Sequence, residues 1–214
     1  SNIRHNIAEI RRMAPGCAVF AMVKANSYGH DDVQTSRILR EEGVEYLGVA
    51  FIDEAMKLRN SGDTGNILII VSAQPEEADF FIDFNVQTTF SSFEILRAFA
   101  KRAAERHSII NAHLFIDSGM NRDGIRPEQA VEFMKEASQY KNINIIGICT
   151  HFADSDSEYP EFTKMQIQRF NYALKELADG GFADFKYIHA SNSAAILNFP
   201  EAHFNAVRPG ISLY

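Results

Sequence analysis

The order of apolar and polar residues predicts a chain in which short strands alternate with amphipathic helices. Eight apolar runs of strand length, rich in β-branched and aromatic residues, cover residues 18–25, 46–50, 67–72, 86–90, 112–117, 145–152, 186–190 and 205–213. Helical patterns, several opened by Asp, Ser or Pro, cover residues 3–13, 33–42, 53–60, 76–84, 92–106, 127–140 and 160–178. Only a short connection, 192–197, precedes the last run.

Eight apolar runs separated by helices indicate a parallel sheet covered on both faces. The complete count of eight favours a closed (β/α)8 TIM barrel over an open doubly wound sheet. A glycine-rich turn after the first strand would favour the open sheet, but Lys24 and Ala25 stand there instead. Since no linker or repeat divides the chain, we expect residues 1–214 to form a single α/β domain.

Composition narrows the function classes. The net charge of -7 argues against a nucleic-acid surface. The longest apolar runs are strand-sized and no signal-peptide pattern opens the chain, so no membrane partner is expected. Cys17 and Cys149, each within an apolar run, are typical of reduced core thiols, which predicts a cytoplasmic protein.

Polar residues that directly follow strands are the candidates for chemistry, because the carboxyl ends of barrel strands form one face. Lys24 follows four apolar residues. Burial there would lower its pKa toward that of a nucleophilic amine, as a Schiff-base lysine requires. A lysine that simply emerges into solvent at the strand end is the alternative.

Two neighbouring segments predict an anion site after the seventh and eighth strands. Ser193 and its neighbour Asn192 open a short helix, and Gly210 with Ile211 exposes bare backbone on the next strand. Barrels often bind phosphate at this place through backbone N–H groups and a helix start. Taken singly, these residues also suit an ordinary helix cap and a turn.

His151 lies at the end of the sixth apolar run, and Arg208 lies within the eighth. A histidine in that position suits structural support at least as well as proton transfer. Arg208 is buried by its pattern and needs a partner, either a cofactor ring nitrogen or a carboxylate. No spacing of histidines, cysteines and carboxylates resembles a metal site, so no metal is expected.

Five segments together resemble the alanine racemase family, in that family's order and across nearly the whole chain. They are Val23-Lys24-Ala25-Asn26-Ser27-Tyr28-Gly29-His30, Asp117-Ser118-Gly119-Met120-Asn121-Arg122, Thr150-His151-Phe152-Ala153, His189-Ala190-Ser191-Asn192-Ser193-Ala194 and Val207-Arg208-Pro209-Gly210-Ile211-Ser212-Leu213-Tyr214. The resemblance implies a fold-type III enzyme with pyridoxal 5'-phosphate as cofactor. The enzyme would be an isomerase that interconverts L- and D-alanine and so supplies D-alanine as a peptidoglycan precursor. Its full-length form would be a homodimer.

The resemblance also implies a role for each site residue. Lys24 would form the aldimine and act as an acid/base group, Arg122 would contact the substrate carboxylate, Arg208 the pyridine nitrogen, and His151 would stand beside it. The implied catalytic residues are Lys24, Arg122, His151 and Arg208. The implied cofactor-binding residues are Lys24, Tyr28, His151, Asn192, Ser193, Arg208, Gly210 and Ile211.

Two departures from the family concern the loop that carries Arg122. Phe115 stands where many members have a lysine, often carbamylated, that orients this arginine. Asp123 stands where leucine is common and would be a replacement carboxylate if it points inward. The family's C-terminal β-domain, with a second acid/base tyrosine, is also absent from these residues, so the chain resembles an excised barrel and is expected to be weakly active alone.

Two other functions are compatible with a barrel that binds this cofactor. One is a pyridoxal-phosphate-binding barrel without turnover, whose lysine context differs from that of Lys24. The other is a fold-type III amino-acid decarboxylase, whose phosphate loop is a glycine cluster; the pair Gly180-Gly181 instead suits the end of a helix.

Overall fold

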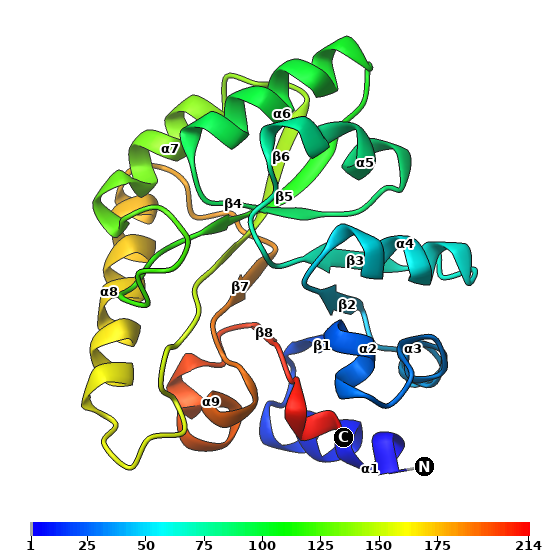
Figure 1. Ribbon diagram of the computed structural model, residues 1–214. Coiled ribbons are helices and arrows are strands. Elements are labelled where there is room, and N and C mark those ends of the chain that lie inside the picture. The colour runs from blue at the N-terminus through cyan, green and yellow to red at the C-terminus, as the bar shows by residue number, and fades with distance from the viewer. Residues whose placement is uncertain (1) are drawn as a thin grey trace. The chain divides into compact units, whose positions relative to one another are not determined.

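The computed structural model describes residues 2–214 and contains the predicted alternation of strands and helices (Figure 1). The strands are β1 (Ala18–Met22), β2 (Tyr46–Val49), β3 (Asn66–Ile69), β4 (Thr88–Phe90), β5 (Ile110–Phe115), β6 (Ile143–Cys149), β7 (Tyr187–His189) and β8 (Ala206–Val207). The α-helices are α1 (Asn2–Met13), α2 (Lys24–Tyr28), α3 (Asp32–Glu41), α4 (Ile52–Asn60), α5 (Ala78–Asp83), α6 (Phe93–Glu105), α7 (Ala130–Ala137), α8 (Glu161–Asp179) and α9 (Ser193–Asn198). Short 3-10 turns are η1 (Pro75–Glu77), η2 (Pro127–Gln129), η3 (Pro200–Ala202) and η4 (Ile211–Leu213).

Two compact units divide these elements. The first combines the chain up to Val71 with His189–Tyr214, and the second is Ser72–Ile188. In the first unit the order of hydrogen-bonded strands is β3-β2-β1-β8-β7, and in the second it is β6-β5-β4. Every recorded pair is parallel, and the strands follow one another as they do in a (β/α)8 barrel, which confirms the predicted fold class.

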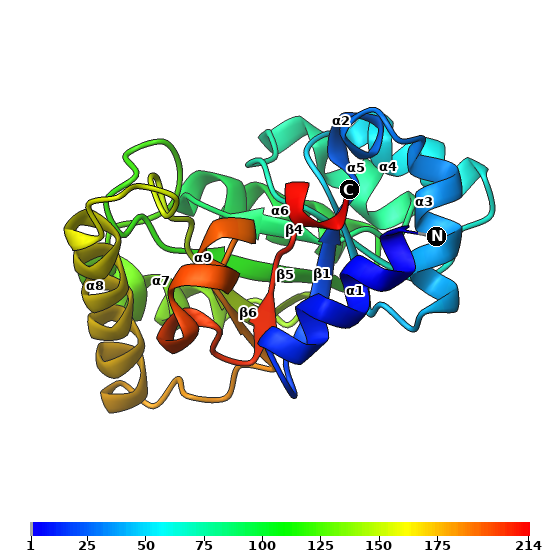
Figure 2. The ribbon, with the colours of Figure 1, turned by 90° about the horizontal axis from the view of Figure 1, so that it is seen from below.

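Aromatic stacking fills the core of the first unit. The ring of Phe20 on β1 stacks on Tyr46 of β2 with centroids 4.1 Å apart, and it lies 4.9 Å from the ring of His189. Helix α1 adds the buried Ile7 and Ile10 and packs against α3, α9 and η4 (Figure 2). The predicted helix before the first strand therefore belongs to this core.

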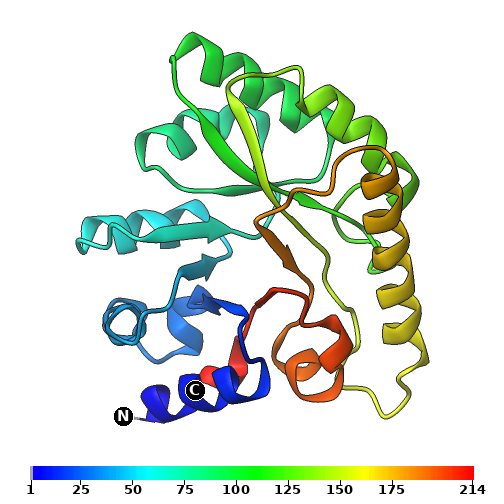
Figure 3. The same ribbon diagram turned by 180° about the vertical axis from the view of Figure 1, so that it is seen from behind.

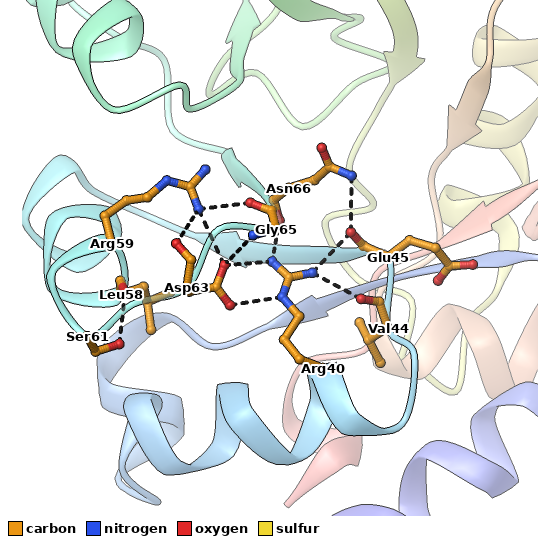
Figure 4. A network of polar contacts seen from close by, with 9 residues as sticks. All are labelled: Arg40, Val44, Glu45, Leu58, Arg59, Ser61, Asp63, Gly65 and Asn66. Atoms are coloured by element: carbon orange, nitrogen blue, oxygen red, sulfur yellow. Dashed lines mark hydrogen bonds and ion pairs between the residues drawn. The ribbon is translucent and has the colours of Figure 1, made fainter.

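A half-buried ion-pair network fixes the connection between α3, α4 and β3 (Figure 4). Asp63 accepts hydrogen bonds from Arg40 Nε at 2.9 Å and from Arg59 Nη1 at 3.3 Å. Arg40 also donates to the carbonyl of Asn66 at 2.8 Å, so its guanidinium reaches the start of β3. Burial lowers the pKa of Arg59 from its usual value. These residues stabilise the unit and carry no candidate chemistry.

Phenylalanines dominate the core of the second unit, where α6 packs on β4, β5 and β6 (Figure 3). Phe99 of α6 meets the ring of Phe90 on β4 edge-on with centroids 5.5 Å apart, and it lies 5.3 Å from Phe81 of α5. Ser92 caps α6 by accepting the N–H of Ile95, as a serine before an apolar helix should.

Among the described residues, no helix combines the length and apolarity needed to cross a membrane.

Most of the strands end earlier than predicted, and the first and last runs show the physical reason. The first run was predicted to reach Ala25, but β1 ends at Met22 because the chain enters a left-handed turn after Lys24. The last run was predicted over residues 205–213, but β8 is only Ala206–Val207. Pro209 has no N–H to donate to a neighbouring strand, and the apolar residues that follow it form η4, where Leu213 is buried.

Candidate functional site

The predicted anion site lies in the first unit, where three donors converge on one oxygen. The hydroxyl oxygen of Ser193 accepts the N–H of Gly210 at 2.8 Å and the N–H of Ser212 at 3.2 Å, and it lies 3.0 Å from the hydroxyl of Ser212. Asn192 precedes it as the cap of α9, with its amide oxygen accepting the N–H of Ala195 at 3.0 Å. Convergent N–H and O–H donors beside a capped turn are what an oxyanion requires.

Gly210 leaves room for the side chain of Tyr28. A Cβ at this position would lie only 2.6 Å from Tyr28 Oη and 3.3 Å from its Cζ. The phenol therefore closes over the backbone that carries the donors to Ser193. Burial raises the pKa of the Tyr28 phenol, which keeps it a neutral O–H donor. Ile211, the next residue, begins η4 with its side chain exposed.

Lys24 is half-buried and begins the turn that also carries Tyr28. Residues 25–28 all have φ between 52° and 55°, in the left-handed region. Such a conformation costs about 1–2 kcal/mol for each residue that is not glycine. Only Gly29, with φ 93°, adopts it without strain. A run of this kind persists only where surrounding contacts support it, and such runs are concentrated at functional sites.

Glu54 on α4 supplies much of that support. Its carboxylate accepts the N–H of Ala25 at 2.6 Å, and it also accepts the N–H groups of Ala50 at 2.7 Å and Phe51 at 3.1 Å. One charged group thus joins the segment after β1 to the segment after β2. Asn26 Oδ1 adds a second anchor by accepting from Lys57 Nζ at 3.1 Å.

Arg208 is buried with only 5% of its surface exposed. Its guanidinium donates to the carbonyls of His189 at 2.9 Å and Ala190 at 3.0 Å, and Nη1 lies 2.6 Å from His189 Nδ1. These contacts fix the position of the guanidinium.

In the second unit, Arg122 lies exposed on a closed loop after β5. The carboxylate of Asp117 accepts the N–H groups of Gly119 at 2.9 Å and Asn121 at 3.0 Å. Asp123 Oδ2 accepts the hydroxyl of Ser72 at 2.5 Å. A cavity of about 540 Å³ lies over the loop and is lined by Arg122 and both aspartates.

His151 follows β6 and is held through its backbone. Its carbonyl accepts Gln166 Nε2 of α8 at 3.1 Å, and Gln166 Oε1 accepts the N–H of Ala153 at 3.0 Å. Ser118 and Thr150 share a hydrogen bond of 2.7 Å, which links the segments after β5 and β6.

Within residues 2–214, His, Cys, Asp and Glu side chains form no group of three or more that could hold a metal ion.

The structure therefore groups the predicted site residues by unit. Those of the first unit are Lys24, Tyr28, Asn192, Ser193, Arg208, Gly210 and Ile211, and those of the second are Arg122 and His151. Three supporting residues were not singled out from the sequence, namely Glu54, Gln166 and His189. The signal for His189 was present, because it opens one of the five segments, whereas Glu54 and Gln166 sit in ordinary helix patterns.

Comparison with known proteins places the chain among alanine racemases. The family described as alanine racemase, N-terminal domain, matches residues 1–214. Alanine racemases of Carboxydothermus hydrogenoformans and Methanococcus maripaludis are 40% and 42% identical to the chain, with all of the chain and 57% and 58% of those proteins covered. The solved structure of alanine racemase from Clostridium difficile 630 in complex with cycloserine is 32% identical to the chain, with a TM-score of 0.95. The match covers all of this chain and 59% of that structure's chain. The chain thus spans less than two thirds of the length of these relatives.

Proposed function

Since the chain belongs to the family of alanine racemase N-terminal domains, we propose that it is the cofactor-binding barrel of an enzyme that interconverts L- and D-alanine. The cofactor is pyridoxal 5'-phosphate. The observation that carries this proposal is the set of donors around Ser193. This set lies beside Tyr28, and Tyr28 belongs to the same turn as Lys24. An amine and an anion site on neighbouring segments suit a ligand that bears both an aldehyde and a phosphate.

The geometry of the first unit fits this cofactor. The hydroxyl of Ser193 now accepts the N–H groups of Gly210 and Ser212, and a phosphate oxygen would take its place as their acceptor. Tyr28 and the backbone of Ile211 would complete the phosphate site, with Asn192 shaping the helix start. A side chain at position 210 would fill this space, as the 2.6 Å approach of Tyr28 Oη shows.

Arg208 would hold the ring nitrogen of the cofactor. Carbonyl acceptors at 2.9 Å and 3.0 Å fix its guanidinium, and an arginine at that nitrogen would disfavour protonation of the ring. The ring would then be a weaker acceptor of electrons, which would disfavour side reactions such as transamination. For His151 we propose the supporting role that the family resemblance implies.

Pyridoxal phosphate, when bound, would supply a carbonyl that condenses with amines and a conjugated ring that accepts the electrons of a departing α-proton. Lys24 would hold the cofactor through Nζ and then exchange the α-proton on one face of alanine. Arg122 would bind the alanine carboxylate by a charge-assisted hydrogen bond. We further propose that residues 1–214 act as one barrel domain of a homodimer in the cytoplasm, where D-alanine serves as a peptidoglycan precursor. The two cysteines, both free, agree with a reducing compartment.

Reductive trapping tests the assignment of Lys24. The chain is incubated with pyridoxal phosphate, treated with borohydride and mapped by peptide mass spectrometry. We expect a stable adduct on Lys24 and none on Lys57, an exposed lysine already paired with Asp32 at 2.6 Å. Labelling of other lysines while Lys24 stays unmodified would remove the basis of the proposal.

Turnover by residues 1–214 alone is expected to be about 10² to 10⁴-fold slower than that of a full-length relative, the usual effect of losing one positioned acid/base group. Inversion needs a proton removed on one face and delivered on the other, and Lys24 reaches only one face. The measurement is alanine racemisation at saturating cofactor. Equal turnover would mean that a second base lies within these residues.

A further inference from the structure

We propose that Asp123 is a positioning residue that fixes Arg122 by fastening its loop to Ser72 and Ser91. The inference rests on the proposed function, in which Arg122 binds the carboxylate of alanine. It concerns a residue that departs from the family pattern, and it is carried by the contacts of the second unit.

The first observation is that both neighbours of Arg122 are anchored. On one side, the N–H of Asn121 donates to the carboxylate of Asp117 at 3.0 Å. On the other side, Asp123 Oδ2 accepts both the N–H of Ser72 at 3.2 Å and its hydroxyl at 2.5 Å. The backbone of Arg122 is therefore held at two points, and a charged acceptor makes the second one strong.

The second observation is that Ser72 does not act alone. Its hydroxyl is also hydrogen-bonded to the hydroxyl of Ser91, which follows β4. Asp123 Oδ1 accepts the N–H of Gly124 at 2.9 Å, so both carboxylate oxygens are engaged. The carboxylate thus connects the loop after β5 to two other segments of the same unit.

The third observation concerns Phe115, which cannot accept a hydrogen bond. Its ring packs beneath the loop, where a Cβ on Gly124 would lie 2.6 Å from Phe115 Cδ1. Gly124 has φ 104°, a conformation that glycine adopts most easily. Phe115 thus gives the loop only apolar side-chain support. Backbone hydrogen bonds of Ile125 with Phe115 at 3.0 Å and with Asp117 at 2.8 Å close the end of the loop, and Asp123 adds its side-chain attachment.

This arrangement orients Arg122 without neutralising it. Within residues 2–214, the recorded partners of Asp123 are serine and backbone donors, and Arg122 takes part in no recorded ion pair. Arg122 lines the cavity of about 540 Å³. Asp123 thus acts on the substrate through the backbone next to Arg122.

Hydrogen exchange in the cofactor-free chain tests the anchor itself. The variants are D123N, which removes the charge, S72A, which removes the hydroxyl donor, and the double variant. D156N makes the same chemical change at an exposed aspartate of the same unit and serves as the control. We expect amides of residues 118–125 to exchange about tenfold faster in D123N and S72A, with little further increase in the double variant because both act on one contact. D156N should leave these amides unchanged.

Calorimetric titration of alanine into the cofactor-loaded chain tests the consequence for substrate. D123N should weaken alanine binding about tenfold, while in the background of R122A it should cause no further loss. A purely structural role would not produce that dependence on Arg122, since it would weaken binding equally in both backgrounds.

Each result decides a separate claim. Unchanged exchange in D123N and S72A would overturn the anchor, and faster exchange with unchanged alanine affinity would overturn its role in positioning Arg122. If the unsubstituted chain fails to bind cofactor and alanine at all, the proposed function fails, whereas the exchange measurement still confirms or overturns the anchor.

Discussion

Replacing Gly210 by alanine tests whether the phosphate site depends on the close approach of Tyr28. The new Cβ would lie 2.6 Å from Tyr28 Oη and 3.3 Å from Cζ. Since non-bonded heavy atoms prefer separations of about 3.5–4.0 Å, the hydroxyl has to move by about 1 Å. Tyr28 ends a left-handed turn that its neighbours already strain, so its ring has little freedom to move away.

Two opposing effects set the size of the loss. Overpacking of this kind costs about 1–3 kcal/mol. Alanine also restricts the unfolded chain, which offsets about 0.4–1 kcal/mol of that cost. We expect G210A to lower the free energy of unfolding by about 1–2 kcal/mol, which for a chain of this size lowers Tm by about 3–6 °C.

A double-mutant cycle with Y28F supplies the control. Phenylalanine removes the oxygen that the new Cβ would meet first, so the double variant should recover about 1 kcal/mol relative to the sum of the single changes. Urea unfolding of the cofactor-free chain measures this coupling. Affinity for pyridoxal phosphate, followed by absorbance, should stay low in the double variant because Tyr28 also holds the phosphate. Strictly additive free energies, or a G210A variant as stable as the parent, would refute the steric argument.

Three further predictions concern other parts of the first unit. S193D should weaken cofactor binding by about tenfold or more, because a carboxylate repels the phosphate, and unchanged affinity in an absorbance titration would contradict the phosphate site. D63A should lower the free energy of unfolding by about 1–3 kcal/mol, since it leaves two half-buried guanidinium groups without their carboxylate, and a urea midpoint equal to that of the parent would exclude this. Burial raises the pKa of the Tyr214 phenol from its usual 10.0 to about 12. The stability that the buried neutral phenol contributes is therefore complete below pH 10 and is lost as the pH rises toward 12. Between pH 9 and pH 11 the parent should therefore lose more stability than Y214F, by at most about 1.4 kcal/mol per pH unit, and equal losses would show that burial of the phenol has no such effect.

Strand and helix positions could be predicted because burial on both faces leaves a plain apolar pattern. The run that begins at Tyr46 is one example, and the capped helix after Ser92 is another. The last run was misleading for a physical reason. Leu213 is buried like a strand residue, but Pro209 and Gly210 turn the chain into a 3-10 segment that covers the core without pairing.

Site residues could be predicted where the side chain itself is chemically distinctive. Lys24 and Arg208 are costly to bury, and Ser193 opens a helix, so each leaves a signal in the sequence. Glu54 and Gln166 leave none, because they act on backbone groups that approach only after folding. An acidic residue in the first turn of a helix is fully explained by the helix dipole.

The turn after Lys24 shows most clearly why local preference and function diverge. Four successive residues in the left-handed region cost about 4–8 kcal/mol if each costs 1–2 kcal/mol, an amount comparable with the total stability of many domains. No local pattern of Ala25, Asn26 and Ser27 predicts that conformation, and only Asn26 tolerates it well. Contacts from α4 must offset the cost, chiefly the charge-assisted bond from the N–H of Ala25 to Glu54. Glu54, on a separate helix, therefore helps to hold the turn that begins with Lys24.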